Sequence, residues 1–379
     1  MRKLNLTPLK YLLIIENLTC VFRNYLCLRK CTRCLVTIWV VFETGHMFFN
    51  VYYNIVHGQN AELKAQRIYF FSSTAFSIYV MTSSLYFSKR FYKLLSNFDE
   101  FYNIFEDDVY NKKMKRAQKV MIWMVVCFIG IKFIVFYIMQ VKTEDLENGL
   151  VSNTVSEYSV TVNDFRYIFQ YFILDCILLI VAEQLRAISR SIDSELSAMM
   201  ENQRNMGHVE GLPRVVLNYE KINKWAQAYE SINESTHLCN SMFSVQLTIM
   251  LLIVTAYYII LLYSIAIITV EGVHTVKTLV MNLFSMSVFL LALLVISRAG
   301  QKIQNSSQQL RQRLCELCVH TLGNEEYYKL AKDLLRCVRT RPVRIHVFGT
   351  LDVNMSMLPS IVVLFTSYTV IALQFNNVL

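Results

Sequence analysis

The last apolar stretch of the chain, residues 357–377, carries hydroxyl and amide groups along one helical face. Residues at alternating intervals of four and three share a face of an α-helix. Lipid disfavours polar groups, so this face is expected to contact protein or water. It either lines a water-filled pore or packs on neighbouring helices through small polar residues. The face is formed by Ser360, Leu364, Ser367, Ile371 and Gln374.

The pore interpretation assigns Gln374 and the adjacent Phe375 to a gate near the end of the helix, since apolar rings can close a pore by dewetting. The face carries no carboxylate. Rings of uncharged polar groups discriminate poorly among cations, so weak cation selectivity is expected.

Two charged residues, Lys132 and Asp175, fall inside apolar stretches. A helical rise of about 1.5 Å per residue places each of them about 14 Å below the external face of a membrane. An isolated charge at that depth costs about 2.5–3.5 kcal/mol. The two side chains are therefore expected to form an ion pair or to contact a polar ligand.

Aromatic side chains and a few polar groups gather in the expected outer halves of the spans. This mixture suits a pocket for a small organic ligand, although interfacial Tyr residues are also common where no ligand binds. The predicted ligand-binding residues are Tyr79, Lys132, Tyr137, Tyr167, Gln170, Tyr171, Asp175, Asn282 and Ser285.

Two Cys-x-x-Cys pairs, Cys31/Cys34 and Cys315/Cys318, could together ligate zinc, but they lack the usual spacing of paired ligands. Free or palmitoylated thiols are the favoured interpretation. The sequence contains no phosphate-binding Gly loop, no H-E-x-x-H and no G-x-S-x-G. We therefore expect neither enzymatic activity nor a metal or cofactor.

The composition indicates which class of protein positions these residues. Of 379 residues, 54% are apolar and 17% are charged, whereas soluble proteins carry about 25% charged residues. A membrane span needs about 20 mostly apolar residues. The sequence therefore predicts an all-α membrane protein with seven transmembrane helices, at residues 35–56, 67–87, 119–141, 165–185, 242–265, 275–297 and 357–377.

Positive charge sets the predicted orientation. Of the 37 Lys and Arg residues, 31 fall in segments 1–34, 88–119, 186–241 and 298–345. Basic loops lie on the cytoplasmic side of a membrane, so the N-terminus is expected in the cytoplasm and the C-terminus outside the cell. The same rule accounts for the net charge of +9 without a nucleic-acid partner.

Long cytoplasmic helices are expected to extend the spans and to pack as a bundle. Apolar residues recur at helical spacing over residues 185–199 and, more loosely, over residues 301–340. The predicted organisation is a cytoplasmic N-terminal segment 1–34, a six-span ligand-binding domain 35–297, a cytoplasmic helical anchor 298–356 and a seventh, pore-lining span 357–379.

Four residues near the C-terminus, Ser367, Tyr368, Gln374 and Phe375, resemble the T-Y-x5-Q-F signature of insect gustatory receptors, with Ser in place of the usual Thr. The resemblance implies a ligand-gated cation channel in the plasma membrane of sensory neurons, in which four seventh spans share one pore. It also implies subunit contacts through the cytoplasmic helices and a tastant pocket among spans two to six.

The partners that the resemblance implies are a small organic ligand, monovalent and divalent cations, lipid, and further subunits in a homotetramer or a heterotetramer. Sugar-sensing members usually carry Glu after the motif Tyr, so Thr369 favours a bitter or other non-sugar ligand. Three alternatives stay open: a non-conducting chemoreceptor that signals through a cytoplasmic partner, a sugar-sensing channel, and a secondary transporter. A transporter is disfavoured because no internal repeat or pair of broken spans is evident.

Overall fold

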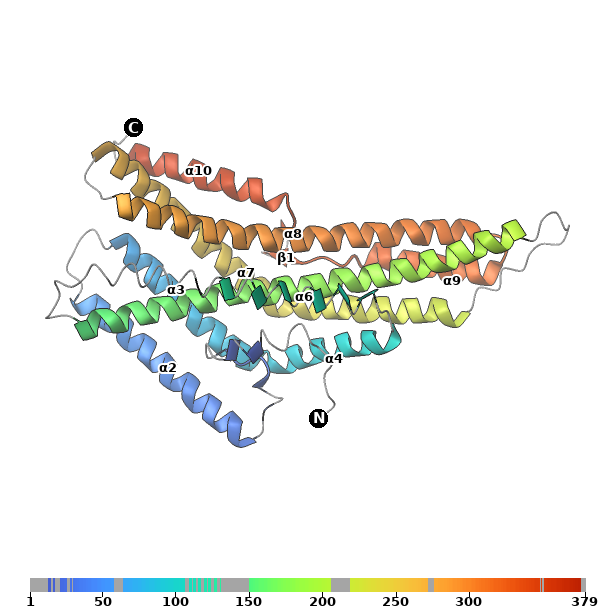
Figure 1. Cartoon of the computed structure of the whole chain (residues 1–379), viewed down its shortest axis with the longest axis horizontal. Helices are drawn as coiled ribbons and strands as arrows, with labels where there is room; N and C mark the ends of the chain where they lie inside the picture. The colour runs from blue at the N-terminus through green and yellow to red at the C-terminus, as the bar shows by residue number, and fades with distance from the viewer. Residues whose placement is uncertain are drawn as a thin grey trace.

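The protein is a long bundle of α-helices (Figure 1). The structure is a computed structural model of the whole chain. It describes residues 13–14, 16–17, 21–25, 28, 30–57, 64–105, 109–110, 112–113, 115–116, 119–120, 122–123, 126–127, 130, 150–205, 219–271, 276–347, 349 and 351–375.

The predicted spans correspond to helices wherever the structure describes them. Predicted span three, residues 119–141, lies largely outside the described residues. By length and composition, Tyr219–Ala256 contains an apolar window long enough to cross a membrane, and Met357–Ile371 is a shorter apolar helix. The helices are α2 Lys30–His57, α3 Lys64–Tyr86, α4 Ser88–Ile104, α6 Leu150–Asn205, α7 Tyr219–Glu271, α8 Val276–His320, α9 Glu325–Thr340 and α10 Met357–Phe375.

The three longest helices, α6, α7 and α8, each continue from a predicted span into a predicted cytoplasmic segment. They run along the long axis of the molecule, with α10 and α9 towards opposite ends (Figure 1). The apolar stripe of α6 predicted over residues 185–199 is buried, as are Ile303, Leu310, Leu314 and Leu317 of α8. The predicted packing of the cytoplasmic extensions is therefore confirmed, because these side chains form one core with the spans.

Helix α4 is an amphipathic helix within the predicted basic loop 88–119. Its apolar side chains, which include Leu94, Phe98 and Phe101, are buried against the bundle. The side chain of Asn97 donates a hydrogen bond to Glu234 of α7 at 3.0 Å. This contact fixes α4 on the cytoplasmic part of α7.

A short β-hairpin connects α9 to α10. Strand β1, His346–Val347, pairs antiparallel with β2, Leu351–Asp352. Gly349 between them has a φ of 72°, which glycine adopts without strain. The sequence analysis predicted a wholly helical anchor over residues 298–356, so this hairpin is a departure from it. Two-residue strands produce no alternating pattern long enough to be recognised.

Candidate functional site

Helix α10, which carries the predicted pore face, has one buried face and is exposed over most of its remaining surface. Met357, Phe365 and Thr369, which are spaced at multiples of four, are buried. The predicted pore face lies elsewhere on the helix, and its residues Ser360, Leu364, Ser367, Ile371 and Gln374 are all exposed in the single chain. The side chain of Phe375, the other predicted gate residue, lies outside the described part of the chain.

The buried face of α10 packs on α7 and α8. The rings of Phe365 and Tyr258 of α7 stack with a centroid distance of 4.6 Å and an interplanar angle of 8°. Thr369 turns its hydroxyl back to its own helix and donates to the carbonyl of Phe365 at 2.8 Å. The polar groups of the predicted pore face are thus left available to a further chain or to water.

The segment that leads into α10 approaches α8 at a single glycine. A Cβ atom built on Gly300 would lie 1.9 Å from the carbonyl oxygen of Val353. The hairpin is also held by Asn240 of α7, whose side chain donates to the carbonyl of Arg344 at 2.9 Å and accepts from the backbone N–H of His346 at 3.2 Å. The start of α10 is therefore positioned by backbone contacts from two long helices.

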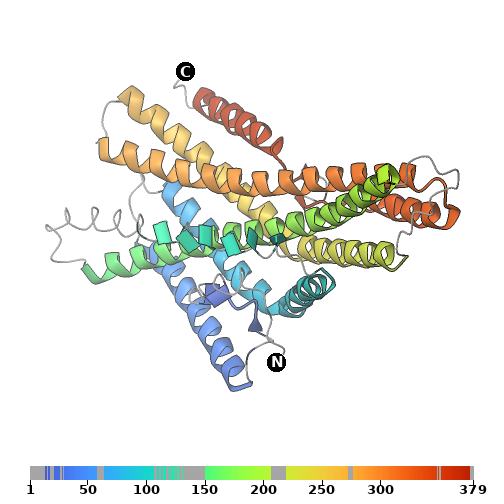
Figure 2. The ribbon, with the colours of Figure 1, turned by 45° about the vertical axis from the view of Figure 1, so that its right-hand side comes forward.

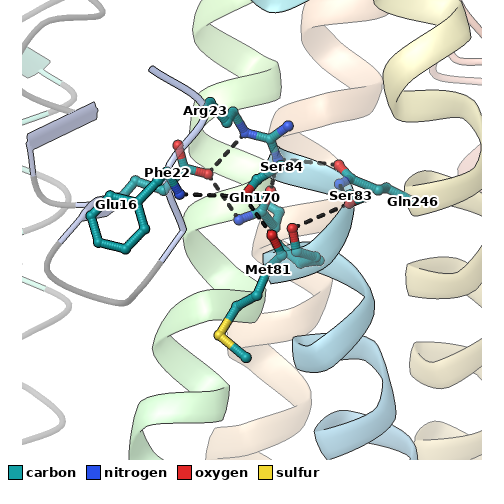
Figure 3. A network of polar contacts seen from close by, with 9 residues as sticks. Glu16, Phe22, Arg23, Met81, Ser83, Ser84, Gln170 and Gln246 are labelled. Carbon is teal, nitrogen blue, oxygen red and sulfur yellow. Dashed lines mark hydrogen bonds and ion pairs between the residues drawn. The ribbon is translucent and has the colours of Figure 1, made fainter. Parts of the chain in front are cut away.

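A buried polar cluster lies where the N-terminal segment meets the bundle (Figure 3). The guanidinium of Arg23 donates to Glu16 at 2.9 Å, to Gln170 of α6, and to Gln246 of α7 at 3.2 Å. Gln246 in turn donates to Ser83 of α3 at 3.1 Å. Arg23 and Glu16 are 1% and 0% exposed, so this pair is sealed from solvent.

Aromatic rings complete the surroundings of Arg23. Its guanidinium lies 4.6 Å from the ring centre of Phe243 and 5.9 Å from that of Phe91. A cation over an aromatic face is stabilised by the ring quadrupole. The sequence analysis missed Glu16, Arg23 and Gln246, because a contact across most of the chain leaves no periodic signal.

The cluster corrects the depth expected for Gln170. Arg23 joins Gln170 to Gln246, which in turn contacts Ser83. Ser83 and Gln246 lie at the ends of predicted spans two and five that charge assigns to the cytoplasm. Residues 165–185 were expected to place Gln170 in the outer half, but α6 begins at Leu150. Because α6 starts before residue 165, that residue does not mark the outer end of the helix. The depth of about 14 Å that was counted from it therefore does not follow for Asp175.

Asp175 is buried, and the cation that acts on it electrostatically is Lys302 of α8. Its predicted partner, Lys132, lies outside the described residues, as does Tyr137. Tyr171 is buried, and Tyr79 is half-buried. Tyr167, Asn282 and Ser285 lie on α6 and α8, but their side chains are outside the described part of the chain.

A second buried ion pair joins α2 to α6. Arg166, which is fully buried, donates to Glu43 at 2.9 Å and contacts the sulfur of Met47 at 3.8 Å. The sequence analysis missed this ion pair between α2 and α6. The presence of a Glu in one apolar stretch and an Arg in another was the signal that could have found it.

Cys31, Cys34 and Cys315 are exposed, and Cys318 is half-buried. Among the described residues, no group of three or more His, Cys, Asp or Glu side chains could hold a metal ion. The two Cys-x-x-Cys pairs are therefore not assembled into a zinc site in this part of the chain.

The comparisons with known proteins agree with this architecture. A model of the 7tm chemosensory receptor family matches residues 6–377. The fold is similar to that of the olfactory receptor OR5 from the insect Machilis hrabei, with a TM-score of 0.67, 11% identity and 97% of both chains covered. The same receptor in complex with eugenol gives a TM-score of 0.65, also at 11% identity, over 97% of this chain and 99% of that one.

No curated protein matches the chain. The predicted fold class, an all-α membrane protein with seven spans, is confirmed by the family match and by the similarity to the solved receptor. At 11% identity, the similarity to this solved receptor supports the fold but not a shared ligand.

Proposed function

Because the chain belongs to the 7tm chemosensory receptor family, we propose that it is a gustatory receptor that acts as a ligand-gated, weakly selective cation channel. Ligand-gated cation channels are the general pattern of the insect chemoreceptor family. The gustatory assignment is supported by Ser367, Tyr368, Gln374 and Phe375, which resemble the gustatory signature.

The observation that carries the proposal is the division of α10 into two faces. Phe365 and Thr369 hold the helix on α7 and α8, while the polar stripe through Ser367 and Gln374 is exposed. Four copies of this stripe around an axis form rings of hydroxyl and amide groups that alternate with rings of Leu364 and Ile371. The proposed assembly is a homotetramer or a heterotetramer with related subunits in the plasma membrane of sensory neurons.

The proposed ligand is a small organic tastant that is not a sugar. Thr369 takes the position at which sugar-sensing members carry Glu, and its side chain is buried on the face of α10 that packs on α7 and α8. The proposed pocket lies in the outer halves of the spans and includes Tyr137, Asn282 and Ser285. Tyr167 is left out because it lies less than one helical turn from Gln170. Gln170 is assigned to the Arg23 cluster, because its side chain already contacts Arg23 and Glu16.

Planar bilayers that contain the purified protein test this proposal against its rivals. The channel predicts single-channel current steps when an active organic tastant is added, with similar permeability to sodium and potassium. Slow, saturable flux without current steps would identify a transporter. Currents that require a cytoplasmic protein, or binding of tastant without current, would identify a receptor that signals through a partner.

A further inference from the structure

Exposed cations line one face of the helical segment between α4 and α6. Lys112, Arg116 and Lys119 are separated by four and three residues, so they share a helical face, and all three are exposed. The same spacing leads next to Trp123 and Val126, which are also exposed. Along this face the surface changes from cationic to apolar between Lys119 and Trp123.

The segment lies beside α6, as the short teal pieces along that helix show in both views (Figures 1 and 2). Lys113 is 3.3 Å from the carboxylate of Glu183 on α6. Arg186 and Arg190 on the same helix lie 2.5 Å and 3.8 Å from that carboxylate. One negative charge is thus shared by three cations.

Among the described residues around this segment, cations outnumber acids. Glu183 forms the ion pairs with these cations. A second acid, Asp99 of α4, interacts electrostatically with Tyr110, a buried residue of the same segment. The described cations on or beside the segment are Lys112, Lys113, Lys115, Arg116, Lys119, Arg186 and Arg190. In the sequence, Glu106, Asp107 and Asp108 precede the segment.

We propose that this basic face binds the headgroup of an anionic phospholipid in the cytoplasmic leaflet. Clusters of four to eight Lys and Arg residues beside the cytoplasmic end of a span attract anionic lipids, at about 1 kcal/mol per cation. A phospholipid fits better than a soluble phosphate because Trp123 and Val126 continue the face with apolar surface for an acyl chain. An exposed Trp at the headgroup level is typical of membrane interfaces.

Binding of lipid to the purified full-length chain in detergent tests the proposal without any current measurement. The probe is a short-chain fluorescent phosphatidylinositol bisphosphate, titrated at two salt concentrations. We expect saturable binding that weakens at high salt and exceeds the binding of short-chain phosphatidylserine, with none for phosphatidylcholine. Removing three charges in K112Q/R116Q/K119Q should weaken binding on the order of a hundredfold.

A matched control removes exposed cations elsewhere: K329Q/R339Q on α9 should change binding by less than about threefold. R116Q alone, which replaces one exposed residue, should weaken binding about fivefold if the triple variant fails to fold. Equal binding by the wild type and by R116Q would overturn the proposal. Equally tight binding of inositol trisphosphate would also overturn it, because it would identify a soluble phosphate as the ligand.

Discussion

Arg23 is a fully buried cation at a place where three helices and the N-terminal segment meet (Figure 3). Burial of an ion is tolerated when charge and hydrogen bonds are both compensated. Glu16 supplies the charge, and Gln170 and Gln246 supply further acceptors. Gln246 of the cluster lies on α7 twelve residues before Tyr258, whose ring stacks on Phe365 of α10. The cluster therefore ties the N-terminal segment to the helix that supports α10.

Replacing Arg23 by Gln is expected to destabilise the fold strongly. Glu16 would keep its buried position without its counter-ion, and breaking a buried pair in this way costs about 3–5 kcal/mol. Thermal unfolding of the purified protein, followed by size-exclusion chromatography, measures the effect. The control K30Q, at an exposed position of α2, should leave the unfolding temperature unchanged. Similar unfolding temperatures for both variants would show that the Arg23 cluster does not stabilise the protein.

Gly300 is expected to tolerate no side chain. In Gly300→Ala the added methyl group meets the backbone carbonyl of Val353, so α8 or the segment before α10 must move. We expect a loss of about 1–3 kcal/mol in stability, seen as reduced surface expression. Gly45→Ala in α2 is the matched control, because nothing lies within 4 Å of its Cβ position. That variant should be neutral or slightly stabilising through its higher helix propensity.

At the scale of elements, the apolar runs of the sequence predicted the spans well but predicted their depth poorly. Residues 165–185 form the most apolar part of α6, yet the helix starts at Leu150. Residues such as Thr154, Ser156 and Thr161 lower the hydropathy there without ending the helix. Hydropathy therefore showed which part of the sequence forms α6. The contacts of Gln170 were needed to show which parts of the other helices lie at the same level.

The candidate site divides in the same way. The exposed polar face of α10 could be predicted, because helical periodicity lies within one element and its residues are spaced by four and three. The Arg23 cluster could not, because Glu16, Gln170 and Gln246 are brought together by the packing of separate elements. The amphipathic helix α4 was not predicted, because the Lys and Arg residues of segment 88–119 indicated a loop between spans.

The attachment of α4 to α7 is expected to depend weakly on pH. The side-chain hydrogen bond from Lys93 lowers the pKa of Glu234 below its usual value of 4.5. The pair contributes to stability above that value and is lost as the pH falls through the lowered pKa. Glu234 is 44% exposed, so the contribution is about 0–1 kcal/mol.

E234Q should therefore lower the unfolding temperature slightly at pH 7. The difference from the wild type should shrink as the pH falls below about 4, where both proteins lack the ion pair. Thermal unfolding at a series of pH values measures this. A difference that grows on acidification would show that the carboxylate is not stabilised by Lys93.

At the scale of the whole molecule, orientation follows from the distribution of charge. The segments rich in Lys and Arg form one end of the bundle, which contains α4, α9 and the extensions of α6 and α8. The free end of α10 lies at the other end (Figure 1). An asymmetric distribution of this kind determines which end faces the cytoplasm.

A short epitope fused after Leu379 should accordingly be accessible to antibody on intact cells. An epitope fused before Met1 should be accessible only after permeabilisation, because the N-terminus is expected in the cytoplasm. Fluorescence of labelled cells compares the two. Labelling of the C-terminal epitope only in permeabilised cells would reverse the orientation and, with it, the assignment of the basic face to the cytoplasmic leaflet.

The central claim, that α10 lines a cation pore, is tested most directly by the accessibility of two of its positions to a charged thiol reagent during tastant-evoked current. Ser367 lies on the proposed pore face, whereas Val362, also exposed, lies about 140° from Ser367 around the helix at about 100° per residue. The account predicts that a methanethiosulfonate reagent reduces the current of S367C and leaves V362C and the wild type unchanged. Equal effects on the two variants, or an effect on V362C alone, would contradict it.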